Sequence, residues 1–312
     1  MMRRVIGLAR SLSSSSSRLQ QSPRATVLCS SNDVSNTVDA NVVKIEIGAS
    51  RGGGGVGGVV YCPANEFRGL STAEFGAIAG ALNVRAASRV VIASAANVSP
   101  LLAARLWWMF ESHGLSGGAR VLEGGSWSES EVASPNQSLS SPAAHSVSPM
   151  AGASWSPKPV AGAVSTTADV LAAIASSGGV QIVDVRTPAE YAGLDIRGGA
   201  TRGGHVPGAR NVPWTDLVDA AMGREWLDNA QLAAVFERAG VDTKSPCIVI
   251  CQAGIRATAG VLALRALGGN TTILPMNYVG AMAEWLNDRM LPVIHGMEPG
   301  GTGAGGGGLL SR

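Results

Sequence analysis

The sequence has few charged residues, no long apolar run and no extended basic region. Charged residues make up 15% of its 312 residues, and the net charge is +2. Residues 1–32 contain five arginines and no acidic residue, so the rest of the chain is net negative and does not indicate nucleic-acid binding. No apolar run approaches the ~18 residues that a membrane span requires. We therefore expect neither nucleic acid nor a membrane among the partners.

Cysteine is also scarce. The four cysteines are Cys29, Cys62, Cys247 and Cys251, which is too few for a disulfide framework in a chain of this length. Cys247 and Cys251 are separated along an extended run that places their Cα atoms about 13 Å apart, too far for a bridge or a shared metal. Since no Cys-x-x-Cys or paired-His spacing occurs elsewhere, we expect no metal and a reducing compartment.

The head at 1–37 has the composition of a targeting segment. Its residues 1–32 are rich in Arg and Ser and contain no acidic residue, and Asp33 is the first one. This pattern is typical of an organelle transit peptide that is removed between about Arg18 and Asp39. We expect a mitochondrial location. The serine run Ser13–Ser17 leaves a plastid open, and a disordered head without an address would leave the protein cytoplasmic.

The chain length predicts two domains. Changes in composition divide the sequence further, because one internal segment is rich in Ser and Pro and the tail is rich in Gly. The expected parts are a head at 1–37, a first domain at 38–127, a linker at 128–162, a second domain at 163–295 and a disordered tail at 296–312.

A weak internal repeat predicts the fold class. Strand, turn, helix and strand patterns occur in order at 89–93, 94–100, 101–113 and 119–122. The same order occurs at 247–250, 251–256, 257–267 and 271–274. Repeated strand-loop-helix-strand units imply an α/β fold with two domains, each a mostly parallel sheet flanked by helices on both faces.

Cys251 stands where a buried strand turns into a helix. Gly254 permits a tight curl of the chain, whose backbone N–H groups can point at one anion. The helix N-terminus and Arg256 add positive charge, and both favour a thiolate at Cys251. The alternative is a buried structural cysteine, but the position, the glycine and the arginine together indicate a sulfur nucleophile.

Four motifs in order resemble one family. They are the strand Ile182–Arg186, the turn Gly204–Pro213, the Cys-x-x-Gly-x-Arg loop at 251–256 and the segment Tyr278–Trp285. The loop resembles the active site of rhodanese-type sulfurtransferases, whose cysteine carries a persulfide. The resemblance covers residues 160–290. It implies a persulfide on Cys251 and no cofactor.

The same resemblance defines the expected site. Cys251 is the catalytic residue, and the cradle for substrate and persulfide consists of Arg186, Gln252, Ala253, Gly254, Ile255 and Arg256. We expect Arg186 to face the anionic donor and Asp184 to fix the loop through hydrogen bonds. The alternative for Arg256 is a surface arginine at a helix N-terminus. We expect a structural role for His205 in its Pro-Gly turn.

The first half resembles a shortened, degenerate copy of the same domain. Its turn at 94–100 has neither cysteine nor arginine, so this half cannot carry a persulfide. It also lacks the Asp-x-Arg and Gly-His-x-Pro-Gly-Ala elements. The pair Trp107–Trp108 is expected to pack in the core or between the domains.

Three functions compete on this pattern. The first is sulfur transfer from a small anionic donor to cyanide or to a thiol such as glutathione or thioredoxin. The second is a related phosphatase, but those enzymes carry one residue more between Cys and Arg than Gln252–Ile255 provides. The third is a non-catalytic rhodanese-like scaffold that binds partners, and the shortened first domain keeps it open.

The residues around the loop favour thiosulfate as the donor. Mercaptopyruvate enzymes of the family typically have Gly-Ser/Thr-Gly after the cysteine and a second arginine where this chain has Ala192. Here Gln252-Ala253-Gly254 follows the cysteine. We expect thiosulfate to be used at least as well as 3-mercaptopyruvate. Arg197 or Arg202 is a potential substitute for the second arginine, which leaves 3-mercaptopyruvate open as the alternative donor.

Overall fold

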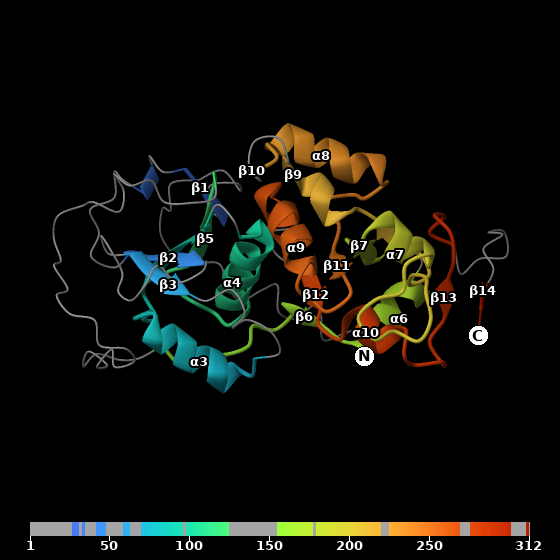
Figure 1. The fold of residues 1–312 in the computed structure, drawn as a ribbon, viewed down its shortest axis with the longest axis horizontal. Coiled ribbons are helices and arrows are strands. Elements are labelled where there is room, and N and C mark those ends of the chain that lie inside the picture. The colour runs from blue at the N-terminus through green and yellow to red at the C-terminus, as the bar shows by residue number, and fades with distance from the viewer. Residues whose placement is uncertain are drawn as a thin grey trace.

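The structure is a computed structural model. It describes residues 27–30, 33–34, 42–47, 59–62, 70–95, 98–124, 155–176, 179–219, 225–268, 275–300 and 310–311. Within these residues two five-stranded parallel sheets lie apart along the molecule, one on the left of Figure 1 and one right of its centre, with helices between and around them. No helix in these ranges is both long enough and apolar enough to span a bilayer.

The second sheet holds the expected strand before Cys251 at its centre. Its order is β6-β12-β11-β7-β8, and all its neighbours pair in parallel. The strands are β6 (Val164–Ser165), β7 (Gln181–Asp184), β8 (Arg210–Asn211), β11 (Cys247–Ile250) and β12 (Met276–Tyr278). The central strand β11 is buried along its whole length, as the β-branched run predicts.

Side chains of β11 alternate between two cores, and helices cover both faces. On one face Cys247 and Val249 pack with α8 (Asn229–Arg238) and α9 (Ala257–Ala266). On the other, Ile248 and Ile250 pack with α6 (Thr167–Ala175), α7 (Pro188–Ala192) and α10 (Ala281–Trp285). Gly260 lets α9 approach the sheet closely, because a Cβ there would lie 2.9 Å from Val249 Cγ1.

The first sheet has the same connection order as the second. Its order is β1-β5-β4-β2-β3, again with parallel neighbours. The strands are β1 (Leu28–Cys29), β2 (Val42–Ile47), β3 (Val59–Cys62), β4 (Arg89–Ser94) and β5 (Ala119–Leu122). The α/β fold class with mostly parallel sheets and flanking helices is therefore confirmed. The expected strand at 271–274 lies outside the described residues.

The head and the linker, two of the segments that we expected to be separate from the domains, contact them. Strand β1 belongs to the segment 1–37, yet it pairs with β5, and Val27, Leu28 and Cys29 are buried. The sheet thus extends into the segment assigned to the head. At the end of the segment assigned to the linker, Trp155 is buried edge-on against Phe75, with ring centroids 5.7 Å apart.

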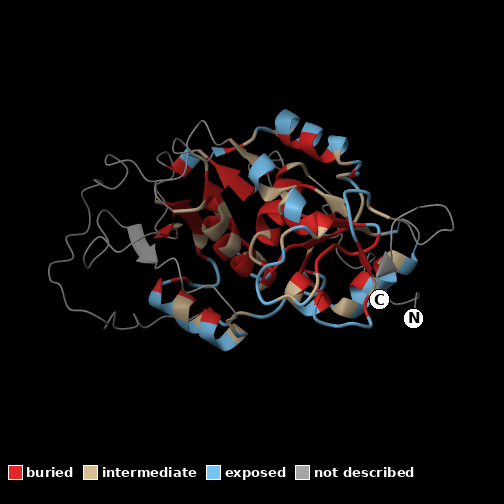
Figure 2. Ribbon diagram, turned by 45° about the vertical axis from the view of Figure 1, so that its right-hand side comes forward, coloured by how far each residue is buried: buried red, intermediate tan, exposed pale blue. Residues whose placement is uncertain are grey.

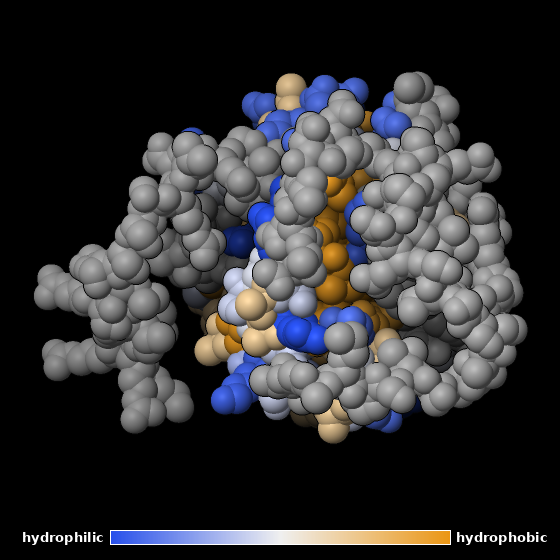
Figure 3. All heavy atoms as spheres, turned by 90° about the vertical axis from the view of Figure 1, so that its left-hand side faces the viewer, coloured by the Kyte–Doolittle hydropathy of each residue, from blue (hydrophilic) through white to orange (hydrophobic). Residues whose placement is uncertain are grey.

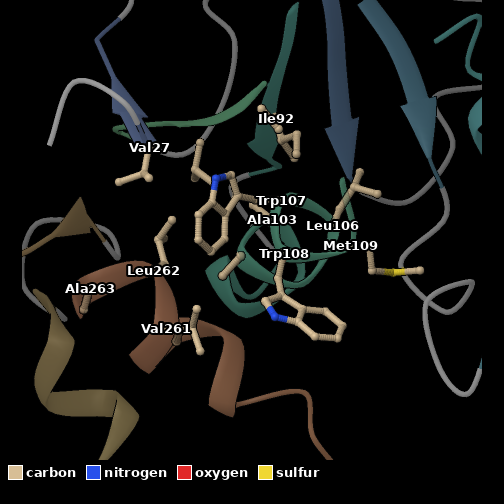
Figure 4. Close-up of a cluster of buried hydrophobic side chains, with 14 of the residues drawn as sticks. Val27, Ile92, Ala103, Leu106, Trp107, Trp108, Met109, Val261, Leu262 and Ala263 are labelled. Atoms are coloured by element: carbon tan, nitrogen blue, oxygen red, sulfur yellow. The ribbon is translucent and has the colours of Figure 1, made fainter. Parts of the chain in front are cut away.

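The helices of the first domain lead to the domain interface. Helix α3 (Thr72–Ala81) buries Phe75 against Phe110 of α4 (Pro100–Ser112). Helices α4 and α9 lie side by side between the two sheets (Figure 1). Trp107 and Trp108 of α4 belong to the same buried cluster as Leu262 of α9, and Figure 4 shows Trp107 beside Leu262. The expected core or interdomain role of the tryptophan pair is confirmed.

Burial follows this arrangement. Figure 2 shows buried strands and a buried α9 inside a shell of half-exposed helices such as α3 and α8. Figure 3 views the end formed by the first domain, where a strip of hydrophobic atoms on the described part of that face is bordered by hydrophilic ones.

The smaller elements are η3 (Trp214–Leu217), β9 (Val218–Asp219), β10 (Glu225–Trp226), β13 (Val293–Ile294) and β14 (Leu310–Ser311). Strand β14, in the segment assigned to the tail, pairs with β13.

Candidate active site

Cys251 directly follows the carboxyl end of the central strand of the second sheet. Its side chain is buried, with 1% of the residue exposed. The loop that begins there passes through Gly254 and leads into α9 at Ala257. Ligands of parallel α/β sheets gather at this edge, outside the carboxyl ends of the strands. The thiol therefore lies at the position where this fold class places its chemistry.

The carbonyl groups of the loop are fixed by neighbouring segments. The first N–H groups of α10 bind the loop, since Met282 N donates to Cys251 O at 2.9 Å and Ala283 N donates to Gln252 O at 3.0 Å. Asn277 Nδ2 of β12 donates to Gly254 O at 2.9 Å. Because the C=O and the next N–H of a trans peptide point in opposite directions, each anchored carbonyl directs the following N–H away from its anchor.

The N–H groups of the loop form a candidate anion cradle. Within the described residues, no backbone N–H of 252–256 donates to a protein acceptor. Gly254 has φ +72°, the left-handed conformation that closes the curl, and a Cβ there would lie 3.3 Å from Val279 O. Successive free N–H groups at a helix N-terminus favour an anion. The predicted cradle of Gln252, Ala253, Gly254, Ile255 and Arg256 is thus brought together.

The anchor of this loop includes a strained residue. Ala281, the first residue of α10, has φ +56°, one of two positive-φ non-glycine residues among those described. This conformation costs a residue with a Cβ roughly 1–2 kcal/mol. The next N–H, that of Met282, holds Cys251 O. The strain therefore lies directly beside the contact that fixes the nucleophile's peptide group.

Arg256 is tied to α7 by a bidentate ion pair. Its Nη1 and Nη2 donate to Glu190 Oε2 and Oε1, both at 2.7 Å. Burial alone would raise the pKa of Glu190, but the hydrogen bonds and charge of Arg256 outweigh it and lower that pKa to about 2. Burial opposes the charge of Arg256 too, yet Glu190 raises its pKa. Arg256 is therefore a permanent cation that is half-buried and fixed, rather than a free surface arginine.

Asp184 and Arg186 form a buried ion pair. Both side chains are 1% exposed, and Arg186 Nη2 lies 2.7 Å from Asp184 Oδ2. Arg186 also donates from Nε and from its backbone N to Asp184, and from Nη2 to Gly204 O. The guanidinium thus faces the Asp184 carboxylate and Gly204 O, and that carboxylate binds Arg186. This buried pair fixes the turn at Gly204 to the end of β7.

The insertion after α7 reaches the loop through Gln252, whose Nε2 donates to Arg197 O at 2.9 Å. The Arg197 side chain is 63% exposed and pairs with Asp195. Arg202 is directed elsewhere, because its Nε and Nη2 donate to carbonyl groups of the segment 285–291. Arg197 and Arg202 are the two arginines that could substitute for the second arginine of mercaptopyruvate enzymes. Of these two, only Arg197 contacts a cradle residue in the described part of the chain, through its backbone oxygen.

The remaining candidate groups are structural. His205 is fully buried and stacks on Tyr191 with centroids 3.6 Å apart, and its Nδ1 lies 2.9 Å from Tyr191 O. Burial lowers the pKa of His205. Burial also raises the pKa of Cys29 and of Cys247 to about 12, so both remain protonated thiols. No group of potential metal ligands occurs in the part of the chain that the structure describes.

Three site residues are absent from the sequence-based set. Glu190 holds Arg256, Asn277 holds Gly254 O, and Arg105 of α4 also donates to Gly254 O, from Nη1 at 3.4 Å. Of these three residues, only Glu190 belongs to a recognisable sequence pattern, the capping box Thr187-x-x-Glu190. That pattern predicts a helix start but not the partner of the carboxylate. Asn277 and Arg105 come close to the loop only through the fold.

Comparison with known proteins agrees with this geometry. Residues 167–288 match the family model of the Rhodanese-like domain. The thiosulfate sulfurtransferase of Corynebacterium glutamicum is 37% identical over 135 residues, which cover 41% of this chain and 43% of that protein. The 3-mercaptopyruvate sulfurtransferase of Escherichia coli is 40% identical over 114 residues, or 36% of this chain and 38% of that protein. The matched part is thus less than half of each relative.

Solved structures extend the likeness of fold to both domains. The 3-mercaptopyruvate sulfotransferase of Escherichia coli aligns with a TM-score of 0.60 and 22% identity over 82% of this chain and 98% of that one. The sulfur transferase subunit of yeast mitochondrial complex I aligns with a TM-score of 0.65 and 20% identity over 83% and 95%. The match at residues 167–288 is thus to a rhodanese-like domain, and the solved structures show the same fold. The expected resemblance to two-domain rhodanese-type sulfurtransferases is confirmed.

Proposed function

We propose that the protein is a sulfurtransferase that moves sulfane sulfur from thiosulfate to a thiophilic acceptor through a persulfide on Cys251. The observation that carries this proposal is the loop that follows Cys251. Its carbonyls are anchored outward, and the N–H groups of 252–256 have no acceptor among the described residues. Such a cradle stabilises an anionic sulfur without a metal.

The reaction consists of two displacements. The Cys251 thiolate attacks the outer sulfur of thiosulfate, the sulfur–sulfur bond of the donor breaks, and sulfite leaves with the bonding electron pair. The acceptor, as an anion, then attacks the outer sulfur of the persulfide. The sulfur–sulfur bond to Cys251 breaks and the thiolate is regenerated. Neither step needs an oxidant or a reductant besides donor and acceptor.

The direct test is intact mass spectrometry after incubation with thiosulfate. A gain of one sulfur atom, removed again by cyanide with release of thiocyanate, supports the proposal. No gain of mass at donor concentrations in large excess would favour the non-catalytic scaffold. The acceptors that we propose for turnover are cyanide, glutathione and thioredoxin, which can be compared by the rate at which each discharges the isolated persulfide.

We predict that thiosulfate is used at least as well as 3-mercaptopyruvate. Ala192 is buried and carries no charge where the family's mercaptopyruvate enzymes typically have an arginine, and Arg202 donates to backbone carbonyls. A carboxylate donor therefore lacks a charge-assisted contact worth on the order of 1.5–3 kcal/mol. The measurement is kcat/KM for both donors with cyanide as the acceptor.

A ratio of kcat/KM more than tenfold in favour of 3-mercaptopyruvate would overturn this preference. Arg197→Ala would then show whether the exposed arginine beside Gln252 supplies the clamp, since the excess should disappear in that variant. Arg238→Ala is a matched control, because Arg238 is an exposed arginine at the end of α8. It should leave the ratio of the two donors unchanged.

We also propose that the head directs the protein to the mitochondrion and is then removed. Because β1 pairs with β5 and Val27 is buried, cleavage should precede Val27, which narrows the expected range to about Arg18 to Thr26. Amino-terminal sequencing of the protein from its native cells should give a start in that range. An intact Met1 or Met2 on most of the protein would overturn import with cleavage.

A further inference from the structure

The carbonyl oxygen of Gly254 has two donors, and they come from different domains. Asn277 Nδ2 of β12 donates at 2.9 Å, and Arg105 Nη1 of α4 donates at 3.4 Å. Arg105 lies 149 residues before Gly254 in the sequence. The active-site loop of the second domain is thus contacted directly by a side chain of the first.

The surroundings of Arg105 hold its guanidinium in place. Its Cζ lies 4.8 Å from the ring centroid of Trp108, over the face of the ring, and a cation is attracted to that face. Burial lowers the pKa of Arg105 to about 10, and the negative charge of Cys251 opposes that shift. The cation therefore loses hydration by its position and is stabilised by negative charge on the sulfur.

We infer that Arg105 is a positioning residue, through which the first domain orients the Gly254–Ile255 peptide and brings a positive charge to the active-site loop. This inference rests on the proposed function. It assigns a task to a domain whose own loop carries no cysteine. The second domain would then depend on the first for its rate of sulfur transfer, rather than only for its stability.

The physical argument has two parts. A carbonyl anchored by Arg105 and Asn277 directs the N–H of Ile255 to the opposite side, toward the interior of the curl. A cation at the loop also attracts an anionic donor and an anionic alkylating reagent. Loss of Arg105 removes one of the two donors together with the charge. Loss of another residue between α4 and α9 that does not contact Gly254 O removes neither this hydrogen-bond donor nor the charge at the loop.

The test compares three variants of the full chain. Arg105→Met removes charge and donor but keeps an apolar side chain for Trp108, and Arg105→Lys keeps the charge. Arg265→Met is the matched control, because Arg265 lies on α9 at the same interface, where its charge interacts with Glu111 of α4. Each variant is first compared with the wild type by circular dichroism and thermal melting.

Two rates are then measured. The first is kcat/KM for thiosulfate, which should fall about tenfold in Arg105→Met, the effect of about 1.4 kcal/mol. The second is alkylation of Cys251 by anionic iodoacetate and by neutral iodoacetamide, followed by peptide mass spectrometry. The rate with iodoacetate divided by the rate with iodoacetamide should fall several-fold in Arg105→Met, because the charge that attracts the anion is lost. In Arg105→Lys this alkylation ratio should stay near the wild-type value. Arg265→Met should leave both measurements within about twofold.

The inference and the proposed function can fail separately. If the wild type forms no persulfide, the proposed function fails, while the alkylation ratios still test the position of Arg105. If the wild type is active and Arg105→Met matches Arg265→Met in both measurements, the inference is overturned. It is also overturned if kcat/KM falls in Arg105→Met while the alkylation ratio of that variant is unchanged, because Arg105 would then place no charge at the active-site loop. If Arg105→Met does not fold, Arg105→Lys must still show slower transfer with an unchanged ratio.

Discussion

Cys251→Ser should abolish sulfur transfer and leave the fold intact. A serine hydroxyl nearly matches the thiol in size, so the buried position after β11 tolerates it. It is far less acidic than a thiol and cannot hold sulfane sulfur. We expect activity below roughly one hundredth of the wild-type rate, and no gain of mass after thiosulfate. The measurements are thiocyanate formation and intact mass on the same sample, with circular dichroism as the check on folding.

Two other buried cysteines are matched controls for this variant. Cys29→Ala and Cys247→Ala remove thiols whose pKa is raised to about 12 by burial, so neither is a nucleophile near neutral pH. Each should keep the wild-type persulfide and a turnover within about twofold. Cys247 also lies on β11, so its variant tests the same strand. More than a few per cent of activity in Cys251→Ser would refute the assignment of the nucleophile.

The sequence predicts the nucleophile and its loop because their chemistry is local. A β-branched strand, a glycine and a helix start within a few residues are enough to place Cys251 at the carboxyl end of a parallel strand. The same patterns predict the bounds of β5 and β11 correctly and those of α4 and α9 to within a residue. Local periodicity therefore accounts for the sheet, the loop and the helix that follows it.

The partners of charged residues are harder to predict, for two reasons. Glu190 and Arg256 are 66 residues apart, and Arg105 and Gly254 are 149 residues apart, so no local pattern relates them. Asp184 and Arg186 are different, because residues two apart on extended backbone share a side. The ion pair between Asp184 and Arg186 could therefore have been predicted from the sequence. The structure pairs the Arg186 guanidinium with Asp184 and Gly204 O, since a buried cation requires a fixed counter-charge, and the expected donor contact stays a prediction.

That counter-charge leads to the largest expected change in stability. Asp184→Asn should leave the Arg186 guanidinium buried, with 1% exposure, and without its anion. Removing one partner of a buried ion pair costs on the order of 3–5 kcal/mol. Among the described residues, Arg186 would then keep one acceptor besides residue 184, namely Gly204 O, to which its Nη2 donates. The measurement is the free energy of unfolding from urea titration at neutral pH, followed by tryptophan fluorescence.

Two further variants separate a structural pair from a donor site. Asp184→Leu combined with Arg186→Met removes both charges, and it should be less destabilising than Asp184→Asn, because no unpaired charge remains. Arg186→Met is measured at low temperature, where part of the protein should stay folded. Its KM for thiosulfate should lie within about twofold of the wild-type value, because the guanidinium that is lost binds Asp184 and Gly204 O. A tenfold rise in KM with unchanged kcat would instead place Arg186 in contact with the donor and confirm the original expectation. A double variant as unstable as Asp184→Asn would show that the cost comes from lost packing and hydrogen bonds rather than from the uncompensated charge.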